Sequence, residues 1–145
     1  MTRVLRASCA HPTDHVVVGQ LARKFARELG FDERGASEIA ISAAELVSNA
    51  VRHARFGTLE LRELGEPRPG VEIVVRDEGP GIPSPDLAVV DGWSRGAPLA
   101  PDARPSQGTG CGLGAVRRLT DDTEIQSAPS RTIVIARRYI DSRKR

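Results

Sequence analysis

The sequence predicts an α+β fold in which one β-sheet and one layer of helices form a two-layer sandwich. Apolar residues recur at helical spacing in two long segments, and at least four shorter segments alternate or run apolar as strands do. The chain has 145 residues, the usual size of one domain, and contains no repeat or dividing linker. We therefore expect a single domain over residues 1–145.

Three helices are expected. The first is bounded by Asp14 as N-cap and Gly30 as C-cap, and the second runs from about Ser37 to Ala54. The third begins near Gly112 and follows a run of alternating glycines. The apolar positions that define the first helix are Val18, Leu21, Ala22, Phe25 and Leu29.

The strands are expected at residues 3–7, 58–62, 71–75, 123–127 and 132–139, with a Gly/Pro-rich turn over residues 65–70. A short helical stretch is expected near residues 86–90. Residues 92–108 contain three prolines and little hydrophobic pattern, which predicts a long loop.

The composition argues against several classes of protein. The formal net charge of +2 gives no general attraction to nucleic acid or to anionic membrane. No run approaches the 18 or more apolar residues of a membrane span, and there is no signal-peptide core, so a cytoplasmic location is expected. The two cysteines, Cys9 and Cys111, have no spacing typical of a metal or redox site.

The second helix carries a polar stripe beside its apolar face. Glu45, Asn49 and His53 follow one another at intervals of four residues, about 120° round from that face. A carboxylate and an amide in this register suit a general base, Glu45, and a magnesium ligand, Asn49. An ordinary solvated stripe would show the same pattern. The expected buried residues are Ile39, Ala43, Leu46, Val47, Ala50 and Ala54.

A second motif follows the strand at residues 71–75. Asp77 comes at the end of that strand, and Gly79 and Gly81 follow it closely. A carboxylate there can accept a hydrogen bond from an exocyclic amine such as that of adenine, and the glycines let the backbone approach a flat ring. A plain β-turn explains the glycines equally well.

A third motif precedes the last helix. Glycines alternate from Gly108 to Gly114, so the loop can present backbone N–H groups to anionic phosphates at a helix N-terminus. A flexible hinge is the alternative. The motif is not a Walker A loop, because no Gly-Lys-Ser/Thr follows, and no clear strand precedes it as in a dinucleotide-binding fingerprint.

The three motifs, in this order, resemble those of the GHKL ATPases and kinases. Residues 45–53 resemble the N box, residues 77–82 the first glycine box, and residues 108–114 the second. The resemblance implies the Bergerat fold, a two-layer α+β sandwich with a mixed β-sheet covered on one face by about three helices. It also implies that residues 92–108 form the ATP lid.

The same resemblance implies a role for each motif. Asn49 would bind Mg²⁺, Asp77 would hold the adenine amino group of ATP, and Glu45 would activate an attacking hydroxyl or water. His53 would have a structural role, and Arg95 and Arg104 are candidates for a basic contact to the phosphates. The remaining implied nucleotide-binding residues are Gly79, Gly81, Ile82, Gly108, Thr109, Gly110, Gly112 and Leu113.

Within that family the chain is most similar to the stand-alone anti-sigma-factor serine kinases of bacterial partner-switching systems. This branch implies a serine/threonine kinase acting on a STAS-domain antagonist protein, with a PP2C-type phosphatase as a possible further partner. Three alternatives stay open: an anti-sigma factor that binds a sigma factor directly, a nucleotide-gated module without catalysis, and a slow ATPase.

Overall fold

The computed structural model describes residues 2–54, 56–78, 93–94, 97–98 and 112–142. They form a five-stranded sheet of order β1-β2-β3-β7-β6 and a separate two-stranded pair, β4 and β5. The strands are β1 (Val4–Cys9), β2 (Gly57–Leu64), β3 (Gly70–Asp77), β4 (Trp93–Ser94), β5 (Ala97–Pro98), β6 (Asp122–Ala128) and β7 (Arg131–Tyr139). The described helices are α1 (Asp14–Leu29), α2 (Glu33–Ala54) and α4 (Gly112–Leu119).

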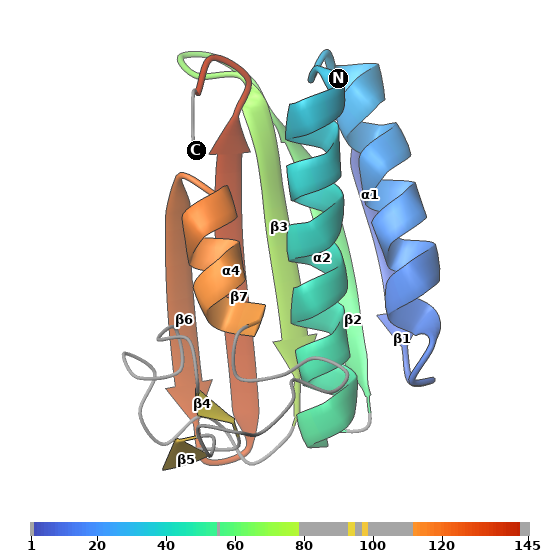
Figure 1. Ribbon diagram of the computed structural model, residues 1–145, viewed down its shortest axis with the longest axis vertical. Helices are drawn as coiled ribbons and strands as arrows, with labels where there is room; N and C mark the ends of the chain where they lie inside the picture. Colours follow the sequence, from blue (N-terminus) through green and yellow to red (C-terminus); the bar gives the residue numbers. More distant parts are fainter. Residues whose placement is uncertain (1, 55, 79–92, 95–96, 99–111, 143–145) are drawn as a thin grey trace.

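The molecule has two layers, as the sequence predicts. All three described helices lie over one face of the sheet, with α2 between α1 and α4 (Figure 1). The other face carries no described helix. None of the described helices is both long enough and apolar enough to span a lipid bilayer.

The strand directions correct one expectation. Every pairing in the described five-stranded sheet is antiparallel, so this sheet is not mixed. Two helices separate β1 from β2, and the second of them reverses the chain so that β2 runs against β1. The strand β6 does run in the same direction as β3, but β7 lies between them and pairs antiparallel with both.

The helix ends differ from the sequence prediction in two places. Asp14 is the first residue of α1 rather than its N-cap, which is Thr13. The Asp14 carboxylate accepts hydrogen bonds from the backbone N–H groups of Ala10 and His11, and these bonds lower its pKa. The second helix begins four residues before Ser37, because Asp32 accepts a hydrogen bond from the Gly35 N–H and caps it.

The C-terminal end of α1 confirms its prediction. Gly30 has a φ of 107°, and its N–H group bonds to the last carbonyls of the helix. This left-handed conformation is one that glycine adopts without strain. The turn it makes lets α2 run back along α1.

The core lies between the sheet and α2. The predicted apolar face of α2 is buried except for Ala54, which is half-buried. Residues of β2 and β3 with the same orientation complete the core, including Leu59, Leu61, Ile73 and Val75. Burial of this face fixes the rotation of α2 about its axis, and therefore fixes where its polar stripe lies.

Several expectations fall on residues outside the described ranges. They are the helical stretch near residues 86–90, most of the lid at 92–108, and the glycine-box residues Gly79, Gly81, Ile82, Gly108, Thr109 and Gly110. Within the predicted lid, the described residues form one short antiparallel pairing, of Trp93 with Pro98 and Ser94 with Ala97.

Gly70→Ala is expected to lower the free energy of unfolding by about 1–3 kcal/mol. A Cβ atom at Gly70 would lie 2.2 Å from the Arg138 carbonyl oxygen and 2.9 Å from Tyr139 Cα. These backbone atoms belong to the paired strand β7 and cannot move aside without disturbing the ladder. Urea unfolding followed by circular dichroism measures the change.

Gly65→Ala is the matched control. It lies in the turn between β2 and β3, and a Cβ atom there would meet nothing within 4 Å. Its unfolding free energy should stay within about 0.5 kcal/mol of the unsubstituted protein. Equal losses in the two variants would contradict the assignment of the close contact to Gly70.

Candidate functional site

The helix α2 places Glu45 and Asn49 at the border between its buried and exposed faces. Both side chains are half-buried, while His53, at the next position of the stripe, is exposed. Their neighbours Leu46 and Val47 are 2% and 1% exposed, so the helix cannot rotate to release the stripe into solvent. The first two positions of the predicted stripe therefore lie at the edge of the core.

The start of α4 lies directly against these two side chains. A Cβ atom built on Gly112 would be 2.7 Å from Glu45 Oε2 and 3.4 Å from Asn49 Nδ2. The N-terminal residue of α4 thus packs on the carboxylate and the amide without a side chain between them. The structure brings together Glu45, Asn49 and Gly112, which are 67 residues apart at their extremes.

Asp77 reaches the same side of the sheet from β3. It ends the strand, and the buried residues Val75 and Ile73, two and four positions earlier, face the helices. Asp77 therefore projects from the helix-covered face and is half-buried. The C-terminal end of β3, where Asp77 lies, is at the end of the sheet to which the last turns of α2 also extend (Figure 1).

Thr132 is a site neighbour that the sequence analysis placed only within a closing strand. It lies opposite Asp77 in the register of β3 and β7 and is 4% exposed. Directly opposed residues of antiparallel strands share a face, so Thr132 and Asp77 are cross-strand neighbours on the helix-covered face. No local signal marks Thr132, because only the pairing of β3 with β7 brings it there.

Arg52 is a second residue that the sequence analysis did not single out. Its guanidinium donates a hydrogen bond to Asn49 Oδ1. A residue three positions along a helix is a surface neighbour, so the spacing within the motif could have indicated this contact. A cation bound by Asn49 Oδ1 would have to share or replace the hydrogen bond from Arg52.

The other predicted site residues divide into two groups. Leu113 is 8% exposed and packs in the hydrophobic core, so in this structure it supports the start of α4 from beneath. Gly79, Gly81, Ile82, Gly108, Thr109 and Gly110 lie outside the described residues, as do Arg95 and Arg104. Their assignments to adenine and phosphate stay predictions.

The described residues fit a magnesium nucleotide. Asn49 offers an oxygen donor of the kind that Mg²⁺ accepts, and Mg²⁺ with a nucleotide needs only one or two protein ligands because phosphates and waters supply the rest. The bare backbone at Gly112 lets the start of α4 come directly against Glu45 and Asn49, where a Cβ atom would meet Glu45 Oε2 at 2.7 Å. The first N–H groups of an α-helix have no partner within the helix, so the start of α4 favours an anion.

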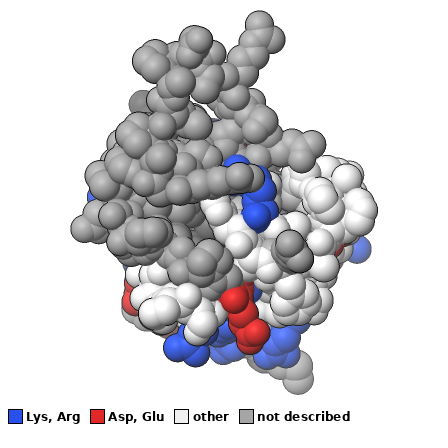
Figure 2. Space-filling view, turned by 90° about the horizontal axis from the view of Figure 1, so that it is seen from below, with Lys and Arg blue, Asp and Glu red and all other residues white. Residues whose placement is uncertain are grey.

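The end of the molecule that holds these residues carries charges of both signs. Viewed from this end, a basic side chain lies near the centre, and acidic and further basic side chains lie along the lower edge (Figure 2). Side chains of both signs are therefore exposed on the described surface at this end of the molecule.

Comparison with known proteins shows which family this chain matches. The model of the histidine kinase-like ATPase domain matches residues 9–138. The chain is 32% identical over 115 residues to the serine/threonine-protein kinase RsbT of Bacillus subtilis (strain 168), and the match covers 79% of each chain.

Two solved structures share the fold. The histidine kinase domain of the blue-light activated histidine kinase of Erythrobacter litoralis EL346 has a TM-score of 0.52 at 19% identity, over 90% of this chain and 66% of that one. The mycobacterial sensor histidine kinase MprB also has a TM-score of 0.52, at 15% identity, over 93% of this chain and 97% of that one. Because the family model matches residues 9–138, the chain belongs to the histidine kinase-like ATPase family.

Proposed function

We propose that this chain is an ATP-dependent serine/threonine protein kinase of a bacterial partner-switching pathway, and that it phosphorylates a STAS-domain antagonist protein in the cytoplasm. The observation that carries the proposal is the contact of Gly112 with both Glu45 and Asn49. The similarity to a serine/threonine kinase over most of the chain supports the same activity.

Each described residue has a distinct part in this proposal. Asp77 accepts a hydrogen bond from the adenine amino group, and Asn49 Oδ1 holds the Mg²⁺ that comes with ATP. The N–H groups at Gly112 face the phosphates. Glu45 takes the proton from the serine or threonine hydroxyl of the partner as that oxygen bonds to the γ-phosphorus and the bond from this phosphorus to the bridging oxygen of the leaving ADP breaks. Bound Mg²⁺ neutralises the phosphate charge, and most of the acceleration comes from positioning and charge.

Arg52 has a second part in the proposal. In this structure it occupies Asn49 Oδ1. If Mg²⁺ were held by that oxygen, Arg52, three residues along the same helix, would lie near the metal-bound phosphates, to which a guanidinium could donate two parallel hydrogen bonds. We assign the basic contact to the phosphates to Arg52 on this ground. The proposal also includes that residues 1–145 form a single domain and that residues 92–108 form the ATP lid.

The decisive experiment is intact-mass spectrometry of a STAS-domain partner incubated with this protein and Mg-ATP. The unsubstituted protein is expected to add one phosphate, and Glu45→Ala is expected to add none while still binding ATP, because only proton transfer is removed. Complex formation and ATP binding without any added phosphate would favour a binding module or a direct anti-sigma factor. Free phosphate released without a partner would favour an ATPase.

Asp77→Asn is expected to weaken ATP binding by roughly 10-fold or more, because an amide pairs less strongly with the adenine amino group than a carboxylate does. Isothermal titration calorimetry with ATP and with GTP measures the effect. The loss should be large for ATP, while weak GTP binding should change little, since guanine carries no amine at that position. Unchanged ATP affinity would overturn the assignment of Asp77 to adenine.

Gly112→Ala is expected to reduce phosphoryl transfer by about 10-fold or more while leaving the unfolding temperature almost unchanged. The new Cβ atom would lie 2.7 Å from Glu45 Oε2, which is the end of a flexible side chain and can move at little cost. Moving the base by about 1 Å is enough to slow a positioned reaction severely.

Gly19→Ala is the matched helical control for Gly112→Ala. Its Cβ atom would make ordinary contacts, 3.6 Å from the Ala40 carbonyl oxygen and 3.7 Å from Ala44 Cβ. This variant should keep full transfer activity and gain slightly in stability from its higher helix propensity. Equal activity of the two variants would show that Glu45 need not stay where this structure places it.

A further inference from the structure

Arg138 is a charged residue buried between the two layers, away from the nucleotide site. It lies on β7 opposite Val71, on the helix-covered face, and its side chain is 5% exposed. A guanidinium in such a place costs several kcal/mol unless it is paired and hydrogen-bonded. Its partners therefore identify what this charge holds in place.

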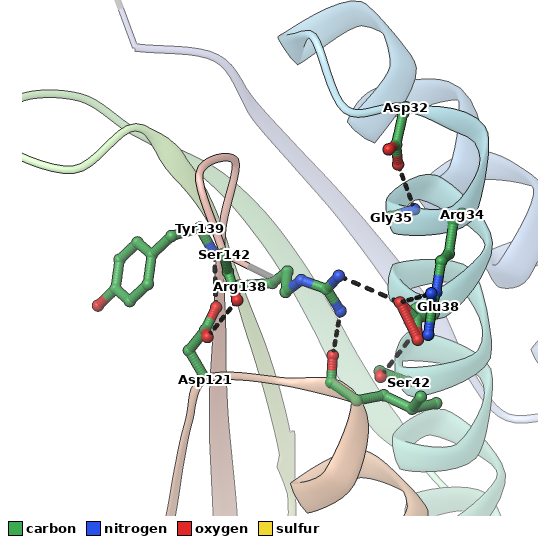
Figure 3. A network of polar contacts seen from close by, with 10 residues as sticks. Asp32, Arg34, Gly35, Glu38, Ser42, Asp121, Arg138, Tyr139 and Ser142 are labelled. Atoms are coloured by element: carbon green, nitrogen blue, oxygen red, sulfur yellow. Dashed lines mark hydrogen bonds and ion pairs between the residues drawn. The ribbon is translucent and has the colours of Figure 1, made fainter. Parts of the chain in front are cut away.

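The guanidinium joins three elements. Its Nη2 donates to Glu38 Oε1 of α2 at 3.1 Å, and its Nη1 donates to the carbonyl oxygen of Leu119, the last residue of α4, at 2.6 Å. Figure 3 shows the Arg138 side chain reaching from β7 toward Glu38. Arg34 Nε lies 3.6 Å from the same Glu38 oxygen, so this carboxylate is held by two cations.

The hydrogen bond from Arg138 to the Leu119 carbonyl oxygen holds the C-terminal end of α4 in place. The helix α4 has eight residues, too few to be stable alone in water. Its last carbonyls lack partners within the helix, and a cation at that end is favoured by the helix dipole. Val116, fully buried, and Arg138 thus hold α4 from two sides.

The two ends of α4 are related to α2 at matching intervals, one through Arg138 and the other directly. Leu119 is tied through Arg138 to Glu38, and Gly112 lies against Glu45. Both pairs are seven residues apart along their helices, about 10 Å at 1.5 Å per residue. The helix α4 therefore lies antiparallel to α2, and a fixed position of Leu119 at Glu38 also determines where Gly112 meets Glu45.

We infer that Arg138 is a positioning residue of the nucleotide site: by holding the C-terminal end of α4 to Glu38, it sets the register of α4 along α2 and so places the Gly112 backbone against Glu45 and Asn49. This inference depends on the proposed function in one respect, which is that one of its two tests measures nucleotide binding. Residues 120–123 support it, because Thr120 Oγ1 bonds to the Val116 carbonyl oxygen and lies 2.9 Å from Thr123 Oγ1, which fixes the same corner.

The test compares two paired replacements on opposite faces of β7. Glu38→Leu with Arg138→Met removes the buried pair and fills its space with apolar atoms, a change that buried ion pairs often tolerate. The matched control is Glu72→Leu with Arg137→Met, which removes an ion pair of 2.8 Å on the open face of the sheet. Each double variant removes one carboxylate and one guanidinium, and the two arginines are neighbours on β7.

Two measurements are made on each protein. Hydrogen exchange of residues 112–119 without nucleotide reports how firmly α4 is held, and isothermal titration calorimetry reports the Kd for Mg-ATP. The variant at residues 38 and 138 should exchange faster in α4 but not in β2, and its Kd should rise by roughly 10-fold or more. The control should match the unsubstituted protein in both.

If the double variant at residues 38 and 138 does not fold, Arg138→Lys tests the inference in its place. A lysine keeps a positive charge near Glu38 but replaces the fork with one compact ammonium, so it cannot hold both partners in the same way. It should give faster exchange in α4 and weaker ATP binding, while Glu38→Gln, which leaves the bond to Leu119, should retain most of the affinity.

The outcomes separate this inference from the proposed function. A folded variant at residues 38 and 138 with unchanged exchange in α4 would overturn the role of Arg138. If the unsubstituted protein bound no nucleotide, the proposed function would fail, and the exchange comparison would still decide whether Arg138 positions α4. Faster exchange in both double variants alike would also overturn the inference, because the open-face pair does not touch α4.

Discussion

The packing of the apolar face of α2 against the sheet is the contact on which the rest of the structure depends. This helix lies between α1 and α4 and contacts β2 and β3. Its buried residues can face the sheet in only one rotation about the helix axis. That rotation brings Glu45 and Asn49 to the border of the core, where a side chain is held by its neighbours yet can still reach a ligand.

The candidate site also needs α4 to come close to this border of the core, where Glu45 and Asn49 lie. At Gly112 the backbone comes so near Glu45 that a single added carbon would collide with the carboxylate. The position therefore combines N–H groups that favour anions with a carboxylate and an amide that favour a cation. A magnesium nucleotide has both charges, which is why the geometry suits that class of ligand.

The buried ion pair of Arg138 and Glu38 complements this arrangement at the far end of α4. Such pairs contribute little net stability, because desolvation offsets most of their attraction. Their directional hydrogen bonds can still fix one arrangement of helices among several that would bury similar apolar area. Here the directed bonds hold α4 by its last carbonyl, and the short helix transmits that position to Gly112. The site and its support are therefore linked through α4, whose start lies against Glu45 of α2 and whose end is joined to Glu38 of α2 through Arg138.

The sequence by itself determined the fold class, the order of most elements and the polar stripe of α2, because hydrophobic periodicity and capping residues act over a few positions. It predicted Glu45 and Asn49 as neighbours for the same reason, and the resemblance of three motifs predicted the family. It did not determine the strand directions, which depend on where β7 inserts between β3 and β6. Nor did it reveal that Thr132 lies opposite Asp77 or that Gly112 packs against Glu45. It also did not reveal the hydrogen bonds of Arg138 to Leu119 and Glu38. These contacts join residues 19 to 100 positions apart, and only the packing of the two layers decides which of them meet.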